Sequence, residues 1–83
     1  MHMDRAIFDL EATVEGTSLY ILLCALLDQG ESLTLDRASV QWNGNGDSLF
    51  KAAQELMERN VLEEVRPLER DKPLRIQPSD MWR

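Results

Sequence analysis

The chain has 83 residues, of which 43% are hydrophobic and 29% are charged, and its formal net charge is −6 at pH 7. These values predict one small soluble globular domain without a deep enclosed active site, because a chain this short buries only about 60% of its unfolded surface. A lone cysteine, Cys24, excludes an internal disulfide and a cysteine-based zinc site, and the apolar run at 19–27 is too short to cross a bilayer.

The position of this apolar run also bears on where the protein acts. Acidic residues precede it, whereas a signal peptide would carry a basic flank, so we expect a cytoplasmic protein, most simply of a bacterium.

Residues 1–46 carry a net charge of −5 and residues 47–83 a net charge of −1. Loose attachment to nucleic acid depends on basic surface, so the acidic surplus opposes it, and any electrostatic contact is expected near 66–75.

The first predicted elements are an N-terminal arm or short helix and, after it, a long apolar helix. Residues 1–16 are expected to form a short helix or a loosely held N-terminal arm, because their apolar side chains fit helical spacing and strand alternation alike. Gly16 is expected to break the pattern, and residues 17–83 to form the domain proper. A helix is predicted over 18–29, ending at Gly30. Because it is apolar nearly all round, it should be the central helix of the core.

Shorter elements follow. Leu33 and Leu35 alternate with polar residues, which predicts a short strand over 32–35. A brief helix is expected over 37–42. The run of asparagine and glycine at 43–46 tolerates positive φ and predicts a turn rather than a linker between domains.

The stretch 47–60 predicts the most regular helix of the chain. Leu49, Ala53 and Leu56 form its apolar stripe, while most of its charged residues point outward. Asn60 lies where this helix must turn left-handed, a role that asparagine fills second best to glycine.

Two strands are predicted after this helix. They cover 61–68 and 74–76 and are joined by a loop at 69–73. Prolines are tolerated only at edges or at strand ends, which favours a two-stranded ribbon at the periphery. The prolines concerned are Pro67, Pro73 and Pro78.

This order of elements resembles the winged helix-turn-helix superfamily over roughly residues 17–77. The best local match is LFKAAQELMERNVLEEV at 49–65, which looks like the recognition helix and first wing strand of MarR-like regulators. The resemblance implies an α+β fold with a three-helix core and a small antiparallel β wing. MarR-like proteins commonly carry a leucine, a charged pair, a glycine and two aliphatics, where this chain has Leu56, Glu58-Arg59, Asn60 and Val61-Leu62.

The resemblance also implies a non-catalytic binding module, in the first place for double-stranded DNA or for a role associated with transcription. The helix at 47–60 would enter the major groove, and the wing would contact phosphates or the minor groove. The residues expected to contact nucleic acid are Asn43, Asn45, Ser48 and Lys51 near the helix, and Arg66, Arg70, Lys72 and Arg75 in the wing.

Protein interaction or homodimerisation without nucleic acid is the competing prediction. The acidic surface favours it, as do Glu55 and Glu58 on the expected recognition helix and the apolar excess within residues 1–16. A plainer interpretation is that residues 1–16 only cover their own chain, and that the wing cations pair with Glu69 and Asp71.

No feature of the sequence predicts an enzyme. His2 is the only histidine, and the chain has no nucleophile motif and no phosphate-binding loop. No cofactor and no metal is expected, since the acidic residues at 28, 31 and 36 have the wrong spacing for a calcium loop.

Overall fold

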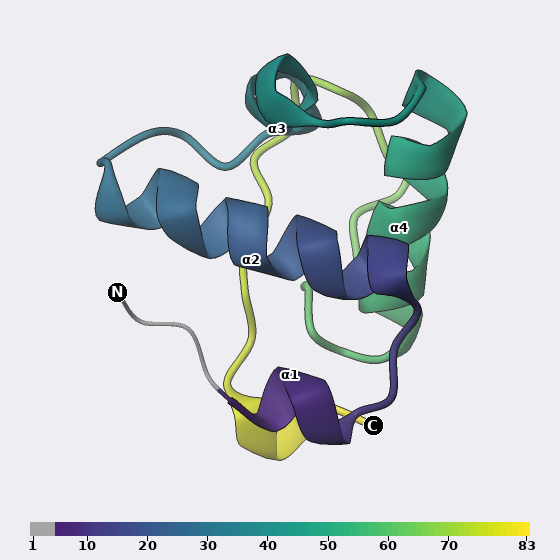
Figure 1. The fold of residues 1–83 in the computed structure, drawn as a ribbon. Coiled ribbons are helices and arrows are strands. Elements are labelled where there is room, and N and C mark those ends of the chain that lie inside the picture. Colours follow the sequence, from purple (N-terminus) through teal and green to yellow (C-terminus); the bar gives the residue numbers. More distant parts are fainter. Residues whose placement is uncertain (1–4) are drawn as a thin grey trace.

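In the computed structural model, residues 5–83 are described, and they fold into a small stack of helices (Figure 1). The long helices α2 and α4 cross each other, and α3 lies across one end of the pair. The elements are α1 (Ala6–Asp9), α2 (Val14–Asp28), α3 (Leu35–Gln41), α4 (Gly46–Glu58) and the 3-10 helix η1 (Ser79–Met81).

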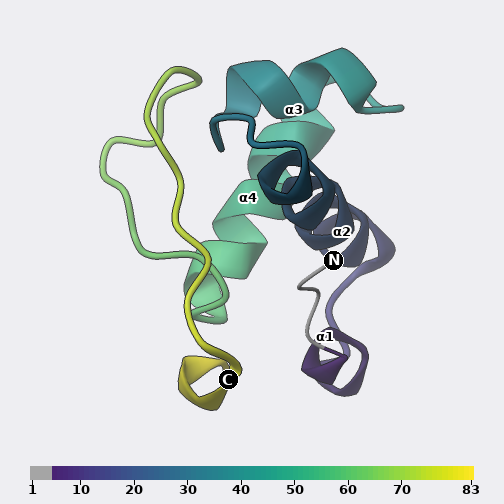
Figure 2. The ribbon, with the colours of Figure 1, turned by 90° about the vertical axis from the view of Figure 1, so that its left-hand side faces the viewer.

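The helices and the C-terminal segment form layers. Figure 2 shows α1 and α2 on one side, α4 in the middle, and the extended segment 61–77 on the other side. The apolar side chains that α2 and α4 turn toward each other therefore lie at the centre of the molecule. Those buried by α2 include Leu19, Leu23 and Leu26, and those buried by α4 include Leu49, Ala53 and Leu56.

The predicted stripe of the helix at 47–60 is confirmed. Leu49, Ala53 and Leu56 are all buried in α4, as their helical spacing requires. Asn60 has φ = 60°, so the chain turns left-handed where the sequence predicted. This turn lets the chain fold back, and the backbone N–H of Val61 donates to the Leu56 carbonyl at 2.8 Å.

The predicted start of the central helix at residue 18 is wrong, because α2 begins one turn earlier, at Val14. Thr13 caps it: its side-chain oxygen accepts a hydrogen bond from the backbone N–H of Gly16 at 3.2 Å. Gly16, which was expected to break the helix, is a buried residue of its first turn. The helix therefore runs across the predicted boundary between residues 1–16 and 17–83.

The predicted strand at 32–35 is also wrong. Leu35 is the first residue of α3, and Thr34 caps that helix by accepting a hydrogen bond from the Arg37 N–H at 3.2 Å. Leu33 lies outside any strand, and its carbonyl accepts a hydrogen bond from the Leu74 N–H at 2.6 Å. One such bond holds the two segments together without making a strand.

The expected antiparallel β wing is not formed, so the predicted α+β winged-helix architecture is wrong for this chain. Residues 5–83 contain no β-strand, and Leu62 and Ile76 form a single isolated antiparallel bridge. Bonds from Glu63 to Arg75 and from Gln77 to Val61 flank this bridge. Pairing stops there because proline has no N–H to donate to a ladder, and Pro67 and Pro73 both lie in the intervening loop. The fold of the described residues is therefore helical.

The C-terminal residues fold back on the helices. The ring of Trp82 meets that of Tyr20 edge to face, with centroids 5.3 Å apart, and its Nε1–H donates to the Gln77 carbonyl at 2.9 Å. The backbone N–H of Arg83 donates to the carbonyl of Arg59, beyond the end of α4. These contacts tie the extended segment to both long helices.

A substitution at Leu56 tests the placement of α4. It is 0% exposed, so Leu56→Ala should lower the free energy of unfolding by about 2–5 kcal/mol through lost burial and the cavity left behind. Urea denaturation followed by circular dichroism measures the change. Gln54→Ala, at an exposed position of the same helix, is the control and should change stability by less than about 0.5 kcal/mol. Equal stability of both variants would contradict the burial of Leu56.

Candidate functional site

The polar residues predicted to contact bases lie around the start of α4, and one of them, Asn45, caps it. The side-chain oxygen of Asn45 accepts from the Ser48 N–H at 2.8 Å. The Ser48 hydroxyl donates to the Asn45 carbonyl at 2.9 Å and accepts from Nε1 of Trp42 at 3.0 Å. These bonds use the side chains of Asn45 and Ser48 to hold the turn between α3 and α4, which leaves them less available to an external ligand.

The other two residues of this group, Asn43 and Lys51, are exposed. Lys51 lies on the outward face of α4, where its neighbours along the helix are Asp47, Gln54 and Glu58, all exposed. The exposed face therefore carries two carboxylates for one ammonium group. Such a face does not attract a phosphate backbone.

The four cations predicted in the wing lie on the extended segment, and three of them pair with carboxylates. Arg66 Nη2 lies 2.9 Å from Glu64 Oε1, and Lys72 Nζ lies 3.8 Å from Glu69 Oε1. Arg75 is exposed and has no ion pair among residues 5–83.

Arg70 is exposed, but its guanidinium is held against α3. Its Nε lies 3.0 Å from Oδ1 of Asp36, and its Nη2 donates to the Ser39 hydroxyl at 3.1 Å. The Arg70 carbonyl accepts from the Asp36 N–H at 3.0 Å, so the loop is fixed through backbone and side chain together. Because Arg70 meets the first turn of α3 while Asn43 follows its last turn, these two residues lie at opposite ends of α3.

The Glu55 carboxylate holds α2 to α4, although the sequence predicts that this residue points outward. Oε2 of Glu55 accepts from the Thr13 N–H at 2.9 Å, and Oε1 accepts from the Thr13 hydroxyl. The Nε of Arg59, four residues further on and just past the end of α4, lies 3.8 Å from Oε2. Nη1 of Arg59 donates to the Leu10 carbonyl at 2.8 Å. No sequence signal marks this network, because its members lie up to 49 residues apart.

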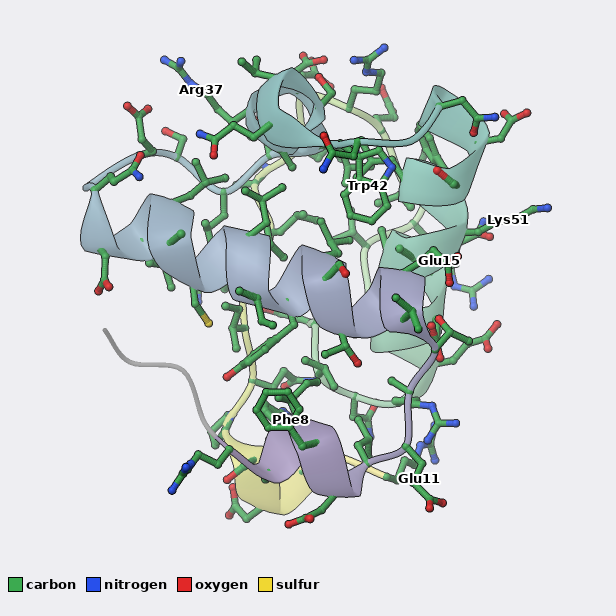
Figure 3. The ribbon with its side chains drawn as sticks, viewed as in Figure 1. Phe8, Glu11, Glu15, Arg37, Trp42 and Lys51 are labelled. Atoms are coloured by element: carbon green, nitrogen blue, oxygen red, sulfur yellow. The ribbon has the colours of Figure 1, made fainter. Side chains whose placement is uncertain are left out.

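The side of the molecule formed by α1 and α2 exposes apolar side chains, with the exposed carboxylates of Glu15 and Asp28 beside them. Val14 is 79% exposed and Phe8 is 56% exposed, although both are large hydrophobic side chains. Figure 3 shows Phe8 beside α1 and Trp42 near α3, with α2 between them. We call this side the outer face, and its residues are Phe8 of α1 with Val14, Ser18, Ile21, Leu22 and Ala25 of α2.

A hollow of about 410 Å³ adjoins the outer face. Val14, Ser18 and Leu22 line it from α2, and Trp42 lines it from the end of α3. The walls that this hollow offers to a side chain of a partner protein are largely apolar, and Glu15 is the charged residue among those that line it.

Cys24 is a free cysteine buried in α2. Burial raises the pKa of the Cys24 thiol above its ordinary value, against a hydrogen bond from Tyr20 that lowers it, so the thiol stays protonated near neutral pH. Residues 5–83 contain no cluster of three or more side chains able to hold a metal ion. Within the same range, no helix has the length and apolar character that crossing a membrane requires.

Comparison with known proteins returned no match from protein-family models, curated sequences or solved structures. Function is therefore inferred from the geometry of the chain itself.

The Glu55 network predicts an unusual effect at Gly16. A helical Gly→Ala change ordinarily stabilises by up to about 1 kcal/mol, but a Cβ at position 16 would overlap Oε1 of Glu55. Gly16→Ala should therefore displace the carboxylate from Thr13, and the loss of these exposed hydrogen bonds, about 0.5–1.5 kcal/mol each, should cancel the usual gain or slightly exceed it.

Gly46→Ala provides the matched control, because a Cβ at position 46 meets nothing within 4 Å. This change should leave stability unaltered or raise it by about 0.4–1 kcal/mol. Thermal unfolding of the two variants beside the wild type measures both effects. Stabilisation by Gly16→Ala would show that Glu55 does not hold Thr13 as described.

Proposed function

We propose that this chain is a non-catalytic module that binds another protein through the outer face. The observation that carries the proposal is the composition of α2. This helix is apolar on the side away from the core as well as toward it, whereas a helix at a free surface normally turns polar residues to solvent. A solvent-facing stripe of this kind is typical of a surface that is covered when the protein acts.

The charges of the described residues support a protein partner over nucleic acid. Arg66, Arg70 and Lys72 each have a carboxylate within 4 Å, which cancels most of their field beyond a Debye length of about 8 Å. The outward face of α4 carries more carboxylate than ammonium groups, and the net charge of the chain is −6. Binding that depends on releasing counterions from phosphates needs unpaired basic side chains, and few of the described residues provide them.

DNA binding is the second candidate, and exposed Lys51, Arg75 and Asn43 favour it. Titration of a fluorescent duplex of mixed sequence, followed by anisotropy, separates the two. We expect no saturable binding at about 50 mM salt, because too few unpaired cations face the duplex. Affinity that falls steeply with salt, and that falls again in Lys51→Glu/Arg75→Glu, would overturn the proposal.

The outer face itself is tested by photo-crosslinking in cells. A benzophenone amino acid at position 14 lies on the outer face, and the same group at the exposed position 54 of α4 is the control. Illumination should yield a discrete crosslinked protein from position 14 and none from position 54. Crosslinks of equal yield from both positions would remove the outer face as the binding surface.

A further inference from the structure

We propose that the hollow beside the outer face binds an arginine side chain of the partner protein. The inference rests on the proposed function and names the chemistry that the partner brings. The hollow of about 410 Å³ lies between the first half of α2 and the turn from α3 to α4. Sites for small ligands commonly measure about 300–1,000 Å³. The hollow is therefore large enough to admit one long side chain of another protein.

Glu15 gives this hollow its negative charge. It is exposed, and its carboxylate has no ion pair among residues 5–83. Lys51 and Glu15 both line a second hollow next to the first, yet no ion pair within the described range joins them. An anionic ligand would meet no basic residue among the described ones that line the first hollow. Charge complementarity therefore selects a cation from outside the chain.

The walls of the hollow suit the aliphatic part of a long basic side chain. Val14 and Leu22 line it from α2, and the ring of Trp42 lies in the space between α2 and the turn from α3 to α4 (Figure 3). The hydrogen bond from Nε1 of Trp42 to the Ser48 hydroxyl fixes the orientation of this ring. Basic side chains bury their methylene groups against apolar surface, and their cations are attracted to tryptophan rings. The hollow thus combines an apolar contact with a charged one.

The amide side chains that line the hollow favour a guanidinium over an ammonium group. Gln41 and Asn43 are both exposed there, and their side-chain oxygens accept hydrogen bonds, as the Glu15 carboxylate does. A guanidinium presents its N–H donors in a planar fork that can pair with both oxygens of a carboxylate, whereas an ammonium is a compact point charge. Arginine can therefore use more of these acceptors at once than lysine can.

Nuclear magnetic resonance of the isotope-labelled full chain tests the site, with n-butylguanidinium as the probe. The indole N–H of Trp42 reports on the hollow, and that of Trp82, which does not line it, is the internal control. The Trp42 resonance should shift saturably in the millimolar range, because so small a probe makes few contacts. The Trp82 resonance should not shift.

Three further probes separate arginine from other occupants of the hollow. We expect n-butylammonium to bind more weakly than n-butylguanidinium, and n-pentanol and pentanoate to leave the Trp42 resonance in place. Equal binding of n-pentanol would show that the hollow takes any apolar chain, and saturable binding of pentanoate would show that it takes anions. Either result would overturn the inference. A Trp42 resonance that moves when the protein alone is diluted would assign the hollow to a second copy of the chain and would overturn it too.

Two variants test the role of the carboxylate. Glu15→Gln keeps the shape of the side chain and removes its charge, so it should weaken n-butylguanidinium binding by about two- to fivefold, as loss of an exposed ion pair does. Glu11→Gln removes the same charge from an exposed position that does not line the hollow, and it should bind the probe as the wild type does. Equal affinities of the two variants would overturn the pairing with Glu15.

The outcomes for this inference and for the proposed function are distinguishable. A wild type that does not bind n-butylguanidinium, but that crosslinks from position 14 and not from position 54, would overturn the inference and leave the proposed function standing. Binding of the probe together with equal crosslinks from both positions would overturn the proposed function, and with it the assignment of the arginine to a partner protein.

Discussion

The arrangement of this fold depends on the hydrogen bonds that Thr13 donates to the Glu55 carboxylate. They hold the first turn of α2 against α4, while Arg59 extends the same network to the Leu10 carbonyl. The segment between α1 and α2 is thereby fixed at both ends. Burial of apolar side chains drives α2 and α4 together but is non-directional, so a few directed bonds such as these set how the helices sit.

The helices could be predicted from the sequence because their signals are local. The spacing of Leu49, Ala53 and Leu56 places α4, and Asn60 marks its end, with no knowledge of the rest of the chain. The segment after α4 could not be predicted in the same manner. Strand formation there depends on pairing between residues as far apart as Leu62 and Ile76, and alternation of apolar residues does not reveal how far such a ladder extends.

The candidate site was predictable in its residue types but not in their surroundings. The cations of the extended segment are visible in the sequence, yet the pairing of Arg70 with Asp36 depends on a tertiary contact between positions 34 residues apart. Likewise, Asn45 and Ser48 have the polar groups that base contacts need, but the same groups suit helix capping, and the fold uses them there. The apolar residues of α2 pointed to the core, and geometry alone shows which of them remain outside.

The two tryptophans give this protein a built-in pair of optical probes. Trp42 reports on the junction of α3 and α4 through its bond to Ser48, whereas Trp82 reports on the return of the C-terminal residues to Tyr20. Indole emission shifts to longer wavelength when the ring meets water, so a chain carrying one tryptophan at a time would reveal which end of the molecule loosens first. The fluorescence of single-tryptophan variants would thus distinguish detachment of the C-terminal residues from opening of the helical stack.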